Sequence, residues 1–111
     1  MEVPEQKRQN VPMIIYPAGK MDAITVSDFS QRFDAGIIAG ETNFIVDMSS
    51  LSYISSAGLR AILTAFKKAE AQNGKLLLCG LNGQIREAFL MSGFLTYFTT
   101  YASVDEALTG L

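Results

Sequence analysis

Residues 44–63 read Phe44-Ile-Val-Asp-Met-Ser-Ser-Leu-Ser-Tyr-Ile-Ser-Ser-Ala-Gly-Leu-Arg-Ala-Ile-Leu63. The stretch begins within an apolar run at residues 43–48, whose continuous hydrophobic centre predicts a strand buried on both faces, as in parallel sheets. A serine-rich segment at 49–57 follows, and we interpret it as a loop. A helix is then predicted from about residue 57 to residue 73, because its apolar side chains recur at helical spacing: Leu59, Ile62, Leu63, Phe66 and Ala69.

Upstream of this stretch the sequence predicts a strand at 11–16, which ends at the turn formed by residues 17–19. A helix follows, in which the apolar residues Val26, Phe29, Phe33 and Ile37 fall on one face. Thr25, with Asp28 three residues later, resembles an N-terminal cap for that helix. Gly36 and Gly40 are expected to close it.

Downstream, Gly74 is placed to cap the long helix, and residues 75–81 form a third predicted buried strand. Asn82 can cap a helix that runs to about Ser92 and ends at Gly93. Residues 96–101 are rich in threonine and tyrosine and predict a short strand. A capping box at residues 103–106 opens a last short helix.

This alternation of strands and helices predicts an α/β fold, because right-handed crossovers between successive strands build a mostly parallel sheet. We expect one domain over residues 1–111, with a central sheet of about four or five strands and about four helices. Residues 1–10 show weak strand character and are expected to form an edge strand.

Composition excludes several classes of protein. Of the 111 residues, 49% are hydrophobic and 18% charged, which is typical of a globular chain. The net charge of −2 gives no reason to expect direct nucleic-acid binding. No apolar run approaches the roughly 18 residues of a membrane span, and residues 1–8 are too polar for a signal peptide. The sequence therefore predicts a cytoplasmic protein without membrane insertion.

The chain also lacks the residues on which most enzymes and metal sites depend. It contains no histidine, which is the commonest general base and metal ligand. Its single cysteine, Cys79, lies in an apolar run and is expected to be a buried, inert thiol. We expect no metal, no cofactor and no enzymatic activity.

Sites in open α/β sheets form where strands end and helices begin. Four such junctions are predicted, at residues 19–22, 49–57, 81–83 and 102–103. Residues 80–83 lack the spacing of a phosphate-binding loop, and residues 56–58 do not form a nucleophile elbow. Asp22 and Asp47 could meet near the strand ends, but we interpret Asp47 as an acceptor for loop N–H groups.

The second junction is distinguished by its serines, of which Ser55 and Ser56 lie immediately before the predicted helix. Serine is a favoured N-cap residue, so an ordinary cap is one interpretation. The other is a phosphorylation site, because a helix N-terminus offers unpaired N–H groups and partial positive charge to a phosphate. The two interpretations are compatible. Gly58 would allow another backbone to approach closely.

The run 44–63 resembles the signature of STAS domains, found in anti-sigma factor antagonists and in sulfate transporters. Residues 19–22 (Gly-Lys-Met-Asp) are similar to the turn of that family, and residues 73–78 (Asn-Gly-Lys-Leu-Leu-Leu) to its following strand. Residues 85–94 (Ile-Arg-Glu-Ala-Phe-Leu-Met-Ser-Gly-Phe) are similar to its third helix. The resemblance covers nearly the whole chain.

The resemblance implies a protein that binds an anti-sigma factor, which is itself a serine kinase, and thereby regulates transcription indirectly. The kinase inactivates such antagonists by phosphorylating the serine that follows Asp in an Asp-Ser-Ser/Thr-Gly-Leu motif, and a PP2C-type phosphatase restores them. Ser56 occupies the modified position here, while Ser55 replaces the Asp. Ser55 is therefore an alternative target.

The resemblance also implies a docking surface around this helix start, and the protein is expected to be a monomer or a weak dimer. We expect the partner-binding residues to be Asp22, Ser55, Ser56, Ala57, Gly58, Leu59, Arg60, Thr64 and Lys67. Two other functions stay open. The domain could be an unphosphorylated interaction subunit of a signalling scaffold or membrane transport complex, or it could bind or convert a small molecule in a pocket with convergent polar groups.

Overall fold

A four-stranded parallel sheet forms the centre of the computed structural model, which describes residues 11–111. Its strands lie in the order β1-β3-β5-β6, and all neighbours are parallel. Their bounds are β1 Met13–Ile15, β3 Asn43–Asp47, β5 Lys75–Cys79 and β6 Thr100–Tyr101. A second parallel pair joins β2 (Gly19–Met21) to β4 (Leu51–Ile54). The predicted α/β class and parallel sheet are confirmed, and the edge strand expected in residues 1–10 lies outside the described residues.

Both faces of the central strands are buried, as the apolar runs predicted. Phe44 and Val46 of β3 belong to the main core, while Ile45 between them faces the opposite side with Leu77 and Cys79. On the main side, the Phe33 and Phe44 rings pack with centroids 4.5 Å apart. Strands with side chains alternating into two apolar layers can lie only in the middle of a sheet covered on both faces.

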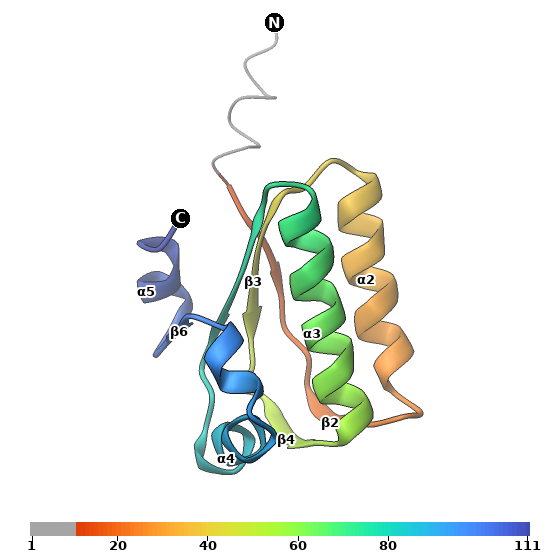
Figure 1. The fold of residues 1–111 in the computed structure, drawn as a ribbon, viewed down its shortest axis with the longest axis vertical. Helices are drawn as coiled ribbons and strands as arrows, with labels where there is room; N and C mark the ends of the chain where they lie inside the picture. The colour runs from red at the N-terminus through yellow and green to blue at the C-terminus, as the bar shows by residue number, and fades with distance from the viewer. Residues whose placement is uncertain (1–10) are drawn as a thin grey trace, which may run out of the picture.

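The helices cover these two faces unequally (Figure 1). Helices α2 (Val26–Ile38) and α3 (Ser56–Ala71) lie side by side on one face, and the short α5 (Val104–Leu108) lies on the other. Helix α4 (Gly83–Ser92) lies near β4, at the end of the molecule where α2 and α3 begin. A 3₁₀ segment, η1 (Phe94–Tyr97), follows it. The predicted junctions at 19–22, 49–57 and 81–83 therefore lie together at the end that holds β2, β4 and the first turn of α3.

The serine-rich segment contains a strand, so its interpretation as a loop is wrong for residues 51–54. Leu51 and Ile54 are buried, and Ser52 and Tyr53 between them are exposed. The N–H of Gly19 donates to the carbonyl of Ser50, and the Ser52 hydroxyl donates to the carbonyl of Gly19. Serine favours turns locally, but pairing with β2 outweighs that preference.

Three other strand predictions extend too far. Strand β1 covers Met13–Ile15 and stops before Pro17, which has no N–H for a ladder. Strand β5 ends at Cys79, because Gly80 turns the chain with a φ of +70°. The predicted strand at 96–101 is mostly 3₁₀ helix, and only Thr100–Tyr101 pairs with β5. The family-like turn at 19–22 is also mainly strand, since Gly19–Met21 forms β2.

Two helix ends differ from their predicted caps. Thr25 makes no side-chain cap for α2, and its own N–H instead donates to the Asp22 carboxylate. At the end of α3 the left-handed residue is Asn73, with a φ of +62°, rather than Gly74. The N–H groups of Asn73 and Gly74 donate to the carbonyls of Glu70 and Ala69, which is the hydrogen-bond pattern of a Schellman motif.

The remaining caps are confirmed, but the expectation that Gly36 closes α2 is wrong. The side chain of Asn82 accepts from the N–H of Ile85, and Gly93 ends α4 with a φ of +79°. The Ser103 hydroxyl accepts from the N–H of Glu106, whose carboxylate in return accepts from the N–H of Ala102. Gly40 follows α2 with a φ of +97°, whereas Gly36 lies inside that helix, where Met13 and Phe44 leave no space for a side chain.

Candidate functional site

Ser55 is the N-cap of α3, as one of the two sequence interpretations predicted. Its backbone is extended, and its hydroxyl accepts from the N–H of Gly58 at 3.3 Å. Its own N–H donates to the carbonyl of Met21 at 2.9 Å. The half-buried Ser55 therefore joins the start of α3 to the end of β2, and its hydroxyl oxygen is engaged in holding the helix.

Ser56 is the first residue of α3 and is exposed. Within residues 11–111 its hydroxyl makes no hydrogen bond. It lies at the positive end of the helix dipole, and the first turn of α3 contains no acidic residue. Of the two serines at the helix start, Ser56 is thus the one whose hydroxyl is exposed and not engaged in a hydrogen bond within residues 11–111.

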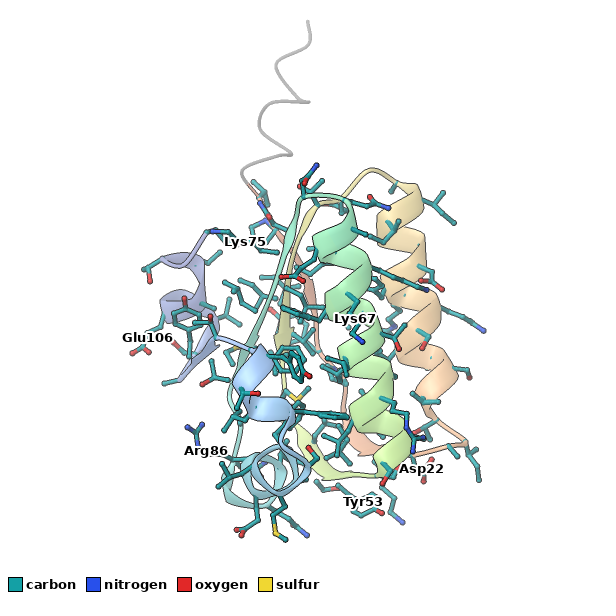
Figure 2. The ribbon with its side chains drawn as sticks, in the orientation of Figure 1. Asp22, Tyr53, Lys67, Lys75, Arg86 and Glu106 are labelled. Carbon is teal, nitrogen blue, oxygen red and sulfur yellow. The ribbon has the colours of Figure 1, made fainter. Side chains whose placement is uncertain are left out.

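Ser56 begins an exposed stripe along α3. Arg60, Thr64 and Lys67 follow it at intervals of four, four and three residues, which places all four side chains on one helix face, and all are exposed. Figure 2 shows Lys67 partway along the same helix. Arg60 and Lys67 form no ion pair with any described residue, whereas the neighbouring Lys68 pairs with Asp34 of α2 at 3.0 Å. We call Ser56, Arg60, Thr64 and Lys67 the α3 stripe, and it carries two free positive charges.

The other predicted docking residues of α3 are buried or half-buried. Leu59 is buried in the main core, Gly58 is buried, and Ala57 is half-buried. A methyl group at Gly58 would come within 2.7 Å of both the Met21 carbonyl oxygen and an Ile54 side-chain atom. These residues hold the first turn of α3 against β2 and β4, and the predicted close backbone approach at Gly58 is confirmed.

Asp22 also has a structural task. One oxygen of its carboxylate accepts from the N–H groups of Ile24 and Thr25, both at 3.0 Å. These two hydrogen bonds hold the pKa of the Asp22 carboxyl below its usual range, and the bond from Thr25 has the larger effect. Asp22 is half-buried and lies at the same end of the molecule as the start of α3 (Figure 2). It shapes the turn next to the stripe, and that turn presents Ile24, which is 86% exposed.

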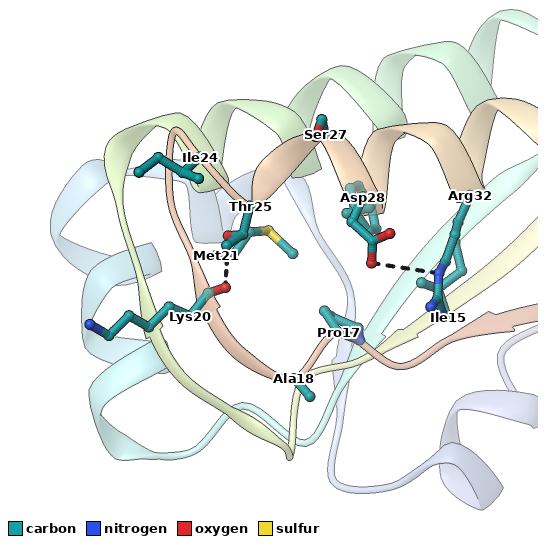
Figure 3. A pocket seen from close by; sticks show the side chains of 11 residues that line it. Ile15, Pro17, Ala18, Lys20, Met21, Ile24, Thr25, Ser27, Asp28 and Arg32 are labelled. Atoms are coloured by element: carbon teal, nitrogen blue, oxygen red, sulfur yellow. Dashed lines mark hydrogen bonds and ion pairs between the residues drawn. The ribbon is translucent and has the colours of Figure 1, made fainter.

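A hollow of about 390 Å³ lies between this turn, β1 and α2 (Figure 3). Its walls are mainly apolar. Of the three charged residues that line it, Asp28 and Arg32 form an exposed ion pair along α2 at 3.8 Å, while Lys20 makes no ion pair with any described residue. The Thr25 hydroxyl donates to the Lys20 carbonyl. Most of these polar groups are therefore engaged with one another instead of converging on the space inside, which does not favour a small-molecule site here.

The remaining candidate groups for chemistry are engaged or inert. Asp47 accepts from the N–H of Ser49 at 3.0 Å, which confirms its predicted role as a loop acceptor. Cys79 is buried, and burial together with the Asp47 charge raises the pKa of its thiol to about 11. Residues 11–111 contain no group of three or more side chains able to hold a metal ion. No helix among them is long and apolar enough to cross a membrane.

Three exposed apolar side chains at this end of the molecule were missed by sequence reasoning. Ile24 lies in the Asp22 turn, Tyr53 on β4, and Met91 on α4. Their spacing along the chain does not group them, because they belong to three separate elements. The burial of β4 does not alternate, since Ser52 and Tyr53 are both exposed between the buried Leu51 and Ile54. An alternating pattern in the sequence could therefore not have indicated that Tyr53 faces the solvent.

Comparison with known proteins decides the family. The STAS domain family model matches residues 2–107. This chain belongs to the STAS domain family. The STAS domain is 35% identical over 89 residues to BtrV of Bordetella bronchiseptica, a protein assigned by name to the anti-sigma factor antagonists; the match covers 80% of this chain and 77% of BtrV.

Solved structures share the fold of this STAS domain. An anti-sigma factor antagonist from Mycobacterium paratuberculosis superimposes with a TM-score of 0.80 at 20% identity, covering 87% of this chain and 82% of that one. The Bacillus cell fate determinant SpoIIAA, solved in its phosphorylated form, gives a TM-score of 0.67 at 25% identity, covering 86% of each chain.

Replacing Ser55 by alanine tests its capping role. Because the hydroxyl that accepts from Gly58 is lost, we expect Ser55→Ala to lower the free energy of unfolding by about 1 kcal/mol. Urea denaturation followed by circular dichroism measures the change. Ser50→Ala is the matched control, since the Ser50 side chain is exposed and makes no hydrogen bond within residues 11–111. Equal effects of the two substitutions would contradict the cap.

Proposed function

We propose that this STAS domain, acting over residues 1–111 as one unit, is an anti-sigma factor antagonist of the cytoplasm. It binds an anti-sigma factor that is also a serine kinase. Phosphorylation of Ser56 makes this STAS domain dissociate from that kinase. A PP2C-type phosphatase reverses the modification. The domain itself is a binding protein rather than an enzyme, and it affects transcription without touching nucleic acid.

One observation carries this proposal: Ser56 is an exposed serine with a free hydroxyl at the first position of α3, while its neighbour Ser55 is engaged as the cap. The family-typical Asp is replaced here by Ser55, and serine and aspartate are about equally good N-caps. The replacement therefore keeps the helix start that would present Ser56 to a kinase. The names of the relatives support the role of an anti-sigma factor antagonist.

The α3 stripe suggests how phosphorylation would act. Arg60 and Lys67 are unpaired cations among the described residues, so a partner that covers the stripe is expected to present acidic groups. A phosphate on Ser56 adds about −1.5 to −2 charges, which such acidic groups would repel. Phospho-Ser56 would also lie one helical turn from Arg60, so it would neutralise one of the cations that attract the partner.

The test isolates the partner kinase from native cells on this domain and combines it with ATP, phosphosite mapping and isothermal titration. We expect phosphate on Ser56, and at least tenfold weaker binding of Ser56→Asp, because even one negative charge faces the acidic partner. Ser50→Asp is the matched control, since it adds the same charge at an exposed serine outside the stripe.

Two results would contradict the phosphorylation switch: no phosphate on Ser55 or Ser56, and unchanged binding of Ser56→Asp. Recovery of scaffold or transporter subunits from cells, without any kinase, would favour the alternative of an unphosphorylated interaction subunit. Detectable turnover of a small molecule would contradict a purely binding role.

A further inference from the structure

A second hollow, of about 300 Å³, lies between β4 and α4. Ile54 and Ala88 contribute apolar surface that is buried or half-buried, and Tyr53 and Met91 contribute side chains that are 44% and 78% exposed. Gln84 and Glu87 add the polar part of the lining. We call these six residues the β4–α4 hollow. An exposed apolar concavity with a polar rim is typical of a protein-interaction site.

The hollow lies close to the start of the α3 stripe. Tyr53 and Ile54 directly precede Ser55 and Ser56 in the chain, and Ile54 packs against Gly58 in the first turn of α3. Figure 1 places β4, α4 and the start of α3 at one end of the molecule. A partner that covers Ser56 can therefore also reach the hollow, because only the end of β4 lies between them.

The lining indicates what the hollow accepts. Its volume is at the lower limit of small-molecule pockets, which are about 300–1,000 Å³, and it suits a single large apolar side chain. Met91 is flexible and adapts to differently shaped apolar groups. Glu87 is exposed and forms no ion pair with any described residue, so it leaves a negative charge beside the apolar floor.

Resting on the proposed function, we propose that the β4–α4 hollow receives an apolar side chain of the anti-sigma factor kinase, next to a basic residue that pairs with Glu87. The docking surface then has two parts of opposite charge. The α3 stripe carries the positive part and the switch, and the hollow supplies an apolar anchor that phosphorylation of Ser56 does not touch. A second copy of this chain fits less well, because a twofold axis at the hollow would bring the two Glu87 carboxylates together.

Met91→Lys tests the anchor, with Leu90→Lys as its matched control. Both residues are exposed on α4, at 78% and 61%, but only Met91 lines the hollow. We expect Met91→Lys to weaken binding of the purified kinase about tenfold, a typical loss for an interface anchor, and Leu90→Lys to change it less than about twofold. In the phosphorylation assay Met91→Lys should raise KM and leave kcat unchanged, because the anchor lies away from the reacting hydroxyl.

Glu87→Lys provides a second variant that should leave the fold intact, because Glu87 is exposed. Reversing its charge removes the partner of the basic residue and should also weaken binding of the kinase. Equal melting temperatures of all variants show that the fold is intact. If Met91→Lys binds like the wild type while Ser56→Asp does not, the anchor is overturned and the proposed function stands. Equal losses in Met91→Lys and Leu90→Lys also overturn it. If the wild type itself does not bind the kinase, both proposals fail. If the wild type self-associates and Met91→Lys does not, the hollow binds a second copy of this chain and the anchor for the kinase is overturned.

Discussion

Gly58→Ala is expected to lower the free energy of unfolding by about 2 kcal/mol and to weaken partner binding as well. The added methyl group would lie 2.7 Å from the Met21 carbonyl oxygen, which cannot move away freely because it accepts from the N–H of Ser55. Overpacking of this kind costs up to about 3 kcal/mol, and the better helix propensity of alanine returns about 1 kcal/mol. To relieve the contact, the first turn of α3 must shift, and Ser56 shifts with it.

Urea denaturation measures the stability, and titration with the kinase measures the binding. Ser55→Ala provides the comparison, because it loosens the same helix start without pushing it away from β2. A protein in which Gly58→Ala is as stable as the wild type would contradict the close packing of α3 on β2 and β4. Stability lost with binding intact would show that the position of Ser56 tolerates a shift.

Gly74→Ala is expected to have the larger effect on stability, about 3 kcal/mol. A methyl group here would collide with the backbone carbonyl of Thr42, immediately before β3. That carbonyl accepts from the N–H of Lys75 at 3.0 Å, where β5 begins to pair with β3. The collision therefore falls on two backbones, and neither can rotate away without breaking the register of the central strands.

The control for this substitution is Gly83→Ala. Gly83 is the first residue of α4 and needs no positive φ, and a methyl group added to it would meet no neighbouring atom within 4 Å. Alanine there should be neutral or slightly stabilising, because it favours the helix. Thermal and urea unfolding measure the stability of both variants. Similar stabilities for Gly74→Ala and Gly83→Ala would contradict the close approach of the Thr42 carbonyl to Gly74.

Local signals in the sequence were enough for the parts of this protein that depend on neighbouring residues. The spacing of Phe29 and Phe33 placed one face of α2, and Asn82, Gly93 and Ser103 marked helix ends where the structure has them. The unbroken apolar runs of β3 and β5 indicated strands buried on both faces. Ser55 and Ser56 were placed at a helix start for the same reason, because capping is decided within one turn of helix.

Features that depend on a distant partner could not be predicted in this way. Residues 51–54 form β4 only because β2, about 30 residues earlier in the chain, offers hydrogen bonds to them. Gly74 looked like a helix cap, but its small size is required by Thr42, and the neighbouring Asn73 takes the left-handed conformation instead.

By itself the sequence determined the α/β class and the pair of serines at the start of a helix, since both follow from local spacing and hydrophobic periodicity. Only the tertiary structure decided how this helix start is held in place, because the N–H of Ser55 donates to the carbonyl of Met21 and Gly58 packs against Ile54. It also decided that Tyr53 and Met91, about 40 residues apart, line one hollow next to Ser56. Packing of β4 against α4 creates that surface, and no local pattern encodes it.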